Sequence, residues 1–312
     1  MNERPEQDIF EGVAEIKAID AAFIEKDWFV TQVISSLFEF KYDGFEFVFT
    51  GGTALSKAHN LIQRFSEDVD FRVIAPKDQQ SRSALSRFKH EVIQHLRLND
   101  FTLENHHITA LNDNRFIVIE FDYPSYFTTP VAIRPHVQIE ISVKATQRKG
   151  IVLPVSSFVN TITKSPPEAE SVLSIDPVES AADKLSALAW RIPTRIRGSE
   201  NDDRALVRHI HDLALLKKLA LFDEYFVDLV AASMLEDEGR LRKNPEFAAF
   251  SMAEKFRLMW SILNSDKEYP GEYDVFVKGV SYAAEGEAPD FTTGLNSVQD
   301  LVERFLKEAG VR

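Results

Sequence analysis

The sequence of 312 residues contains no cysteine. This absence excludes disulfide bonds, zinc sites with thiolate ligands and cysteine nucleophiles. No apolar run approaches the roughly 20 residues that a membrane-spanning helix needs. The first residues, MNERPEQDIFEG, are polar and acidic and do not resemble a secretory signal. We therefore expect a soluble, cytoplasmic protein that does not act on a membrane.

Basic residues are also scarce, since 36 Lys and Arg face 49 Asp and Glu and the net charge is −13. Such a balance argues against a general nucleic-acid coat protein, because phosphate binding depends on basic surface. One stretch departs from the acidic average and carries six basic side chains: Lys184, Arg191, Arg195, Arg197, Arg204 and Arg208. A solvated helix face and a local basic groove are both consistent with this stretch.

The apolar pattern changes from mixed to helical along the chain. Helical spacing predicts two helices in 8–40 and an amphipathic helix in 78–98. Apolar segments predict strands at 47–49, 68–73, 101–103, 115–123 and 136–143. A stretch rich in proline, 150–177, separates them from residues with helical patterns only. We predict an α/β (α+β) fold, with a mixed sheet flanked by helices in 1–170 and an all-α region in 171–312.

The first predicted strand, Phe47-Val48-Phe49, ends at the pair Gly51-Gly52, and Thr53 then opens a helix. The next strand carries Asp68 and Asp70, which project from the same face because residues two apart in a strand do so. Two carboxylates near a glycine turn at a helix start suit a magnesium ion and the phosphates of a nucleotide. We therefore predict Gly51, Gly52 and Thr53 as phosphate ligands.

A third carboxylate lies on a later strand. Segment 136–143 alternates cleanly, which places Glu140 on its polar face. The preceding strand carries Glu120 and Asp122, so the pattern leaves the choice between them and Glu140 open. In a two-metal displacement the carboxylates bind both ions, so Asp68, Asp70 and Glu140 form the predicted metal set.

Four segments together resemble the AbiEii/AbiGii toxin family, a branch of the polymerase-β-like nucleotidyltransferases. They are GGTALSKAHNLIQRFSEDVDF from Gly51, IEKDW from Ile24, ADKLSA from Ala182 and RHIHDL from Arg208. The segments follow the order of the family motifs over roughly residues 20–220. The family often has Arg-Asp where this chain has Arg208-His209.

The resemblance implies a reaction dependent on Mg²⁺ (or Mn²⁺) that moves a nucleoside monophosphate from an NTP and releases pyrophosphate. Some relatives, the MenT toxins, add nucleotides to the 3′ end of tRNA. The resemblance therefore implies an RNA acceptor, a polymerase-β-like sheet and a cognate antitoxin. It also implies that Lys184 neutralises the triphosphate and that Asp212 orients Lys184 or the acceptor.

Several other side chains are candidates with simpler alternatives. Lys57 is placed to reach phosphate or to be an exposed helix lysine, and Arg64 to bind phosphate or to pair with Asp68. An inhibitory phosphate on Ser66 would crowd the metal site with charge. The pair His211-Asp212 also occurs in metal-dependent phosphohydrolases, although no further histidines are spaced around it.

Three hypotheses follow. The first is an NTP-dependent nucleotidyltransferase that modifies RNA as the toxin of a toxin–antitoxin or phage-defence system. The second keeps the site but transfers the nucleotide to a hydroxyl of a protein or small molecule. The third is a non-catalytic nucleotide-binding module, which the acidic composition favours.

Overall fold

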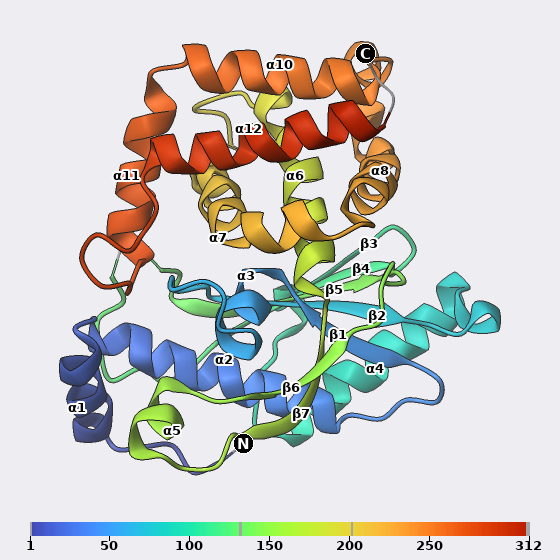
Figure 1. Ribbon diagram of the computed structural model, residues 1–312. Coiled ribbons are helices and arrows are strands. Elements are labelled where there is room, and N and C mark those ends of the chain that lie inside the picture. The colour runs from blue at the N-terminus through green and yellow to red at the C-terminus, as the bar shows by residue number, and fades with distance from the viewer. Residues whose placement is uncertain (1, 131–132, 201, 310–312) are drawn as a thin grey trace. The chain divides into compact units, whose positions relative to one another are not determined.

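The chain folds into two units, Met1–Asp176 (unit 1) and Pro177–Arg312 (unit 2). The computed structural model describes residues 2–130, 133–200 and 202–309 (Figure 1). The mixed α/β organisation of the first part and the helical organisation of the second are confirmed. No helix in the described ranges combines the length and the hydropathy that a membrane crossing requires.

Unit 1 contains a seven-stranded sheet with helices before, between and after its strands. Its strands are β1 (Glu46–Thr50), β2 (Asp68–Ile74), β3 (Ile108–Leu111), β4 (Phe116–Asp122), β5 (His136–Val143), β6 (Ile151–Val155) and β7 (Ala169–Ser174). Its helices are α1 (Gln7–Lys17), α2 (Ala21–Glu39), α3 (Gly51–Thr53), the π segment η1 (Ala54–Ala58), α4 (Arg82–Leu98) and α5 (Phe158–Thr163), with short 3₁₀ turns η2 (Lys77–Gln79) and η3 (Asn105–His107).

The strand order is β3-β4-β5-β2-β1-β7-β6. The pairs β2–β5 and β1–β7 are parallel, and the other neighbouring pairs are antiparallel. Parallel neighbours need a crossover connection, and α4 lies in the one that joins β2 to the later strands. The central strands β5, β2 and β1 therefore come from distant parts of the sequence.

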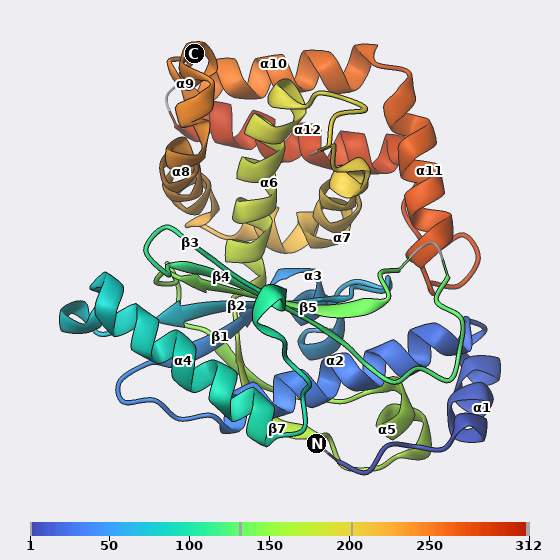
Figure 2. The same ribbon diagram turned by 180° about the vertical axis from the view of Figure 1, so that it is seen from behind.

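The apolar side chains of the central strands form the core of unit 1. In β2 and β5 buried residues alternate with half-buried ones over most of each strand, and the buried set includes Val69, Phe71, Ile139 and Ile141. Helices α2 and α4 lie on the same side of the sheet and contribute to this core (Figures 1 and 2). Burial of apolar surface at about 25 cal/mol per Å² is the main force that holds these layers together. The opposite face of β2 and β5 is consequently left to polar residues.

The predicted strand at Phe101–Leu103 is wrong. Both of its apolar residues are buried, but the segment is irregular and its backbone joins no ladder. Conversely, the stretch 150–177 contains β6 and β7, which were not predicted. Both strands are short and β6 contains a proline, so their sequences lack a clear strand pattern. Strand β7 runs across the division predicted between residues 170 and 171, and its pairing with β1 and β6 joins those residues to unit 1.

The regular elements of unit 2, in the part that the structure describes, are all helices. Its elements are α6 (Pro177–Thr194), η4 (Arg204–Val207), α7 (Arg208–Phe222), α8 (Phe226–Asp237), η5 (Glu238–Lys243), α9 (Pro245–Ala248), α10 (Met252–Ser265), α11 (Glu268–Val280) and α12 (Phe291–Glu308). Helix α6 packs against α7, α8 and α10, and α12 packs against α7. The buried face of α6, which includes Leu185, Leu188 and Ile192, explains its central place.

Candidate active site

The turn after β1 is formed by Gly51 and Gly52, the first two residues of α3. Gly51 has a φ of +78°, a conformation that glycine adopts readily. A Cβ atom at Gly51 would lie 1.9 Å from Oδ2 of Asp70. A Cβ atom at Gly52 would lie 2.5 Å from Nη2 of Arg64 and 2.8 Å from Oγ of Ser66. Both positions therefore need glycine for the backbone to lie directly against these side chains.

Thr53 ties this turn to the next strand. Its side chain is buried, and its hydroxyl donates a hydrogen bond of 2.5 Å to the main-chain carbonyl of Asp68. The π segment η1 follows at once, a conformation that often occurs at functional sites. The proton of the Thr53 hydroxyl is therefore used within the protein, in the contact between the turn and β2.

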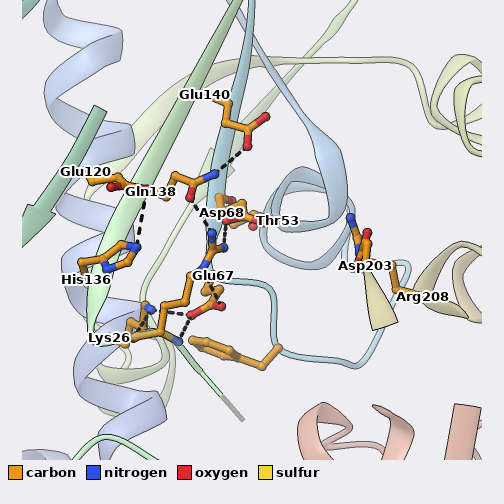
Figure 3. Close-up of polar contacts among 12 residues, drawn as sticks. Lys26, Thr53, Glu67, Asp68, Glu120, His136, Gln138, Glu140, Asp203 and Arg208 are labelled. Carbon is orange, nitrogen blue, oxygen red and sulfur yellow. Dashed lines mark hydrogen bonds and ion pairs between the residues drawn. The ribbon is translucent and has the colours of Figure 1, made fainter. Parts of the chain in front are cut away.

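Three carboxylates project from one face of β2 and β5. The two strands are parallel, with Asp70 opposite Glu140 and Asp68 opposite Gln138. All four side chains are half-buried, whereas the residues between them are buried. Figure 3 shows Gln138 beside Asp68, with Glu140 farther along β5. The sheet register therefore brings two segments far apart in the sequence to the same place.

The register also distinguishes the candidates for the third carboxylate. Glu120 and Asp122 lie on β4, opposite Gln138 and His136 respectively. Strand β5 separates β4 from β2, so these carboxylates are one strand farther from the aspartate pair than Glu140 is. Neighbouring strands are about 4.8 Å apart. The geometry therefore favours Glu140.

Arg134 lies beside these carboxylates and contacts two of the residues on this face. Its guanidinium forms an ion pair with Asp68, and its Nη1 donates to Oε1 of Gln138 at 2.5 Å. Gln138 in turn donates through Nε2 to Oε1 of Glu140 at 2.6 Å. Within the ranges that the structure describes, no three His, Asp or Glu side chains are already gathered as metal ligands. Three carboxylates on one face nevertheless match the oxygen ligands that magnesium and manganese prefer.

A buried lysine braces Arg134 from the side of α2. Lys26 is fully buried, pairs with Glu67, and donates to the main-chain carbonyl of Arg134 at 2.6 Å. Glu67 also accepts from the main-chain N–H of Arg134 at 2.8 Å and from its Nε at 3.0 Å. Burial lowers the pKa of Lys26, and the charge of Glu67 opposes that change. These contacts hold the guanidinium of Arg134 at the edge of Asp68.

The neighbours of Lys26 in the sequence anchor other segments. Glu25 is buried and accepts from the main-chain N–H of Tyr126 at 2.9 Å. Asp27 accepts from Nζ of Lys57 at 2.5 Å and from the main-chain N–H of Phe158 at 2.7 Å. The side chain of Lys57 is 7% exposed, so the alternative of an exposed helix lysine is wrong.

Arg134, Glu67 and Gln138 were not among the predicted site residues. No motif or periodicity marks Arg134, which lies in the irregular segment before β5. The sequence did contain a signal for the buried Lys26 that contacts Arg134, because Glu25-Lys26-Asp27 interrupts a largely apolar helix. Buried charges need partners, so three in succession predict a polar network. The sequence does not show which residues supply those partners.

In unit 2 the predicted contact between Lys184 and Asp212 is present. Nζ of Lys184 on α6 lies 2.8 Å from Oδ2 of Asp212 on α7, and the two side chains are 8% and 0% exposed. Lys184 is therefore buried in an ion pair and does not belong to a solvated helix face. Nδ1 of His211 lies 3.4 Å from the other oxygen of Asp212. No set of histidine ligands surrounds this pair in the described ranges, so the phosphohydrolase alternative gains no support.

The start of α7 carries a second charged cluster. Arg191 and Arg208 both contact Oδ2 of Asp203, at 2.5 and 2.8 Å. Burial opposes ionisation of Asp203, but these two arginines outweigh it and lower the pKa of that carboxyl. Burial, followed by the charges of Arg208 and Lys184, holds the pKa of His209 well below its usual value. His209 is therefore neutral at physiological pH.

Other arginines of the basic stretch are paired as well. Arg195 contacts Asp202 at 2.7 Å and Glu272 at 2.6 Å, and Arg197 contacts Glu272 at 3.1 Å. Both arginines have a pKa raised above the usual value, because these hydrogen bonds outweigh burial. Most positive charge in 184–208 is thus neutralised inside unit 2. An extended basic groove along this stretch gains no support from these contacts.

Comparison with known proteins identifies a family. A family model described as "Nucleotidyl transferase AbiEii toxin, Type IV TA system" matches residues 36–294, well over half of the chain. The matched range includes the five predicted catalytic residues, Asp68, Asp70, Glu140, Lys184 and Asp212. Among curated proteins no relative matches the chain.

Two solved structures are similar to the chain at low identity. MenT4, a nucleotidyltransferase toxin from Mycobacterium tuberculosis H37Rv, has 15% identity and a TM-score of 0.38, over 86% of this chain and 98% of that one. An antigenic nucleotidyltransferase-like protein from Paracoccidioides brasiliensis has 13% identity and a TM-score of 0.38, over 72% and 91%. At these values neither likeness carries an argument about fold or mechanism.

Proposed function

Since the chain belongs to the AbiEii nucleotidyltransferase toxin family of type IV toxin–antitoxin systems, we propose that it transfers a nucleoside monophosphate from an NTP to a hydroxyl of RNA. The observation that supports this most is the placement of Asp68, Asp70 and Glu140 on one face of adjoining strands. The turn at Gly51 packs against the same face, since it lies against the carboxylate of Asp70. Phosphoryl transfer needs this combination of carboxylates and phosphate-binding backbone.

We assign the metal-binding role to Asp68, Asp70 and Glu140. A magnesium or manganese ion bound there would offset negative charge on the phosphates and on the leaving pyrophosphate. Glu140 has a second candidate role, as the base that accepts the proton of the acceptor hydroxyl. The hydrogen bond from Gln138 orients Glu140 for either role.

The glycine turn is the proposed phosphate site. The main-chain N–H groups of Gly51, Gly52 and Thr53 lie at the start of a helical segment, where donors without helical partners favour an anion. Arg64 lies directly behind Gly52 and adds positive charge there. Lys57 supports the turn through its pair with Asp27, which fixes η1 to α2.

Lys184 and Asp212 form the proposed contribution of unit 2. Asp212 is fully buried and orients Lys184 through an ion pair of 2.8 Å. We propose that Lys184 neutralises the triphosphate and that Asp212 acts through Lys184. Replacement of either residue should therefore lower the rate of transfer without removing the metal site of unit 1.

The proposed acceptor is the 3′ end of tRNA, and the proposed regulator is a cognate antitoxin. Ser66 is half-buried beside Gly52, so a phosphate on Ser66 would place negative charge next to the turn that is to bind the NTP. Such a modification is one route by which an antitoxin would silence the enzyme.

The direct test incubates the protein with each labelled NTP, Mg²⁺ and total RNA. Label should enter RNA with the unaltered protein and not with Asp68→Asn or Asp70→Asn. Asp122→Asn is the matched control, because Asp122 is an exposed carboxylate of the same sheet on β4. Equal labelling by the two β2 variants would contradict the assignment of these residues.

A second acceptor class deserves the same experiment. The pairing of Arg191, Arg195, Arg197 and Arg208 with carboxylates leaves the chain little basic surface in that stretch for RNA. A hydroxyl of a protein or small molecule is the alternative that this observation favours. Label in protein instead of RNA would support it, and NTP binding without pyrophosphate release would indicate a non-catalytic module.

A further inference from the structure

Arg134 occupies a place in unit 1 where a cation contacts the proposed metal-binding carboxylates. Its guanidinium pairs with Asp68, the first residue of the predicted metal set, and its Nη1 contacts Gln138. Gln138 in turn contacts Glu140, another residue of that set. Glu67 also accepts a hydrogen bond from Nε of this guanidinium at 3.0 Å. A fixed positive charge thus lies within the proposed metal site itself.

This guanidinium is fixed by more than its contact with Asp68. Glu67 accepts hydrogen bonds from both the main-chain N–H and the Nε of Arg134, which orients the backbone and the side chain together. Glu67 is held in turn by Lys26, whose side chain is fully buried. The two hydrogen bonds between Arg134 and Glu67 do not involve Asp68. Loss of the Asp68 contact would therefore leave the charge of Arg134 nearby.

We propose that Arg134 acts as a built-in cation that competes with the metal ion for Asp68 and so weakens metal binding when no nucleotide is present. The proposal rests on the proposed function, since it takes Asp68 as a metal ligand. A divalent ion beside Asp68 is repelled by the guanidinium when no nucleotide is present. The triphosphate of an NTP supplies negative charge that offsets both cations. Arg134 is thus a positioning residue that disfavours metal without substrate.

The physical reason is Coulombic. A single charge and a divalent ion a few ångströms apart at the edge of a protein repel each other enough to change affinity by on the order of tenfold. Removal of the charge should raise metal affinity in the absence of nucleotide.

The test measures binding of Mn²⁺ by electron paramagnetic resonance, with and without a non-hydrolysable NTP analogue. Arg134→Gln should bind Mn²⁺ on the order of tenfold more tightly than the unaltered protein without nucleotide. Arg134→Lys retains the charge and should stay near the unaltered protein. Arg115→Gln is the matched control, since Arg115 donates to Gln80 and lies outside the carboxylate set.

The outcomes separate this proposal from the proposed function. Loss of Mn²⁺ binding in Asp68→Asn and Asp70→Asn together with equal or weaker binding in Arg134→Gln would overturn the role of Arg134 alone. Unchanged binding in Asp68→Asn and Asp70→Asn would overturn the metal site and the role of Arg134 together. Similar gains in affinity in Arg134→Gln and Arg134→Lys would show a packing effect and contradict the role of charge. Arg134→Met, which preserves the length of the stem, replaces Arg134→Gln if that variant does not fold.

Discussion

Replacement of Gly51 by alanine isolates the close contact between the turn and the site. The backbone at Gly51 has a φ of +78°, and a Cβ atom there would lie 1.9 Å from Oδ2, 2.8 Å from Cγ and 3.0 Å from Cβ of Asp70. Distances this short require Asp70 to move away from the turn. Asp70 lies on a central strand, so its side chain must rotate while its backbone stays in the ladder.

The expected loss of stability has two parts. Alanine in a left-handed conformation costs about 1–2 kcal/mol. Displacement of a packed side chain adds about 1–3 kcal/mol. A total of about 2–5 kcal/mol is large against the 5–15 kcal/mol that typically stabilises a protein. We expect Gly51→Ala to fold with reduced stability and to lose most nucleotidyltransferase activity, because Asp70 no longer lies beside the phosphate turn.

The assay combines urea denaturation with the labelled-NTP reaction. Gly286→Ala is the control, since Gly286 has a φ of +81° and, apart from its chain neighbours, no described residue has an atom within 4 Å of its Cβ position. This control should lose only the conformational part, about 1–2 kcal/mol, and keep its activity. If Gly51→Ala loses no more stability than Gly286→Ala and stays active, the contact between the turn and Asp70 is not required for the site.

Three further predictions concern the buried charges. Lys26→Met should destabilise unit 1 by about 3 kcal/mol in urea denaturation, because Glu67 loses its buried partner. A loss of stability below about 0.5 kcal/mol, as at an ordinary surface site, would contradict this prediction. Stability of unit 2 should fall as the pH drops below the ordinary histidine pKa of 6.5, because the folded pKa of His209 is lowered and the unfolded chain binds the extra proton. His209→Gln should flatten that dependence between about pH 7.5 and 5.5, and an unchanged slope would assign it to other groups. Asp212→Asn should lower the rate of nucleotide transfer by about tenfold or more, because Lys184 is no longer oriented. Binding of Mn²⁺ at unit 1 should stay unchanged. A rate equal to that of the unaltered protein would remove Asp212 from the mechanism.

Local periodicity determined a large part of what the sequence alone showed. Asp68 and Asp70 share a face because strand side chains alternate, and the glycine pair marks a tight turn because only glycine lacks a Cβ atom. Both features depend on residues close together in the chain. The order of motifs over the chain was enough to place it in a nucleotidyltransferase family, which the family match confirms.

Strand pairing decided the rest of the sheet and of the site. Glu140 lies opposite Asp70, whereas Glu120 and Asp122 lie one strand farther away, and no local pattern encodes that register. Phe101–Leu103 has the apolar content of a strand but finds no partner. Long-range pairing depends on packing of the whole unit, so sequence periodicity alone does not select it.

Tertiary structure also decided the partners of the charged side chains. Lys57 is held by Asp27 and is not exposed, and Arg134 reaches Asp68 from a segment without a motif. The sequence alone predicted that Gly51, Asp68 and Asp70 belong to one site. Only the tertiary structure places Glu140 opposite Asp70 and Arg134 beside Asp68, because those contacts form only when distant segments pack together.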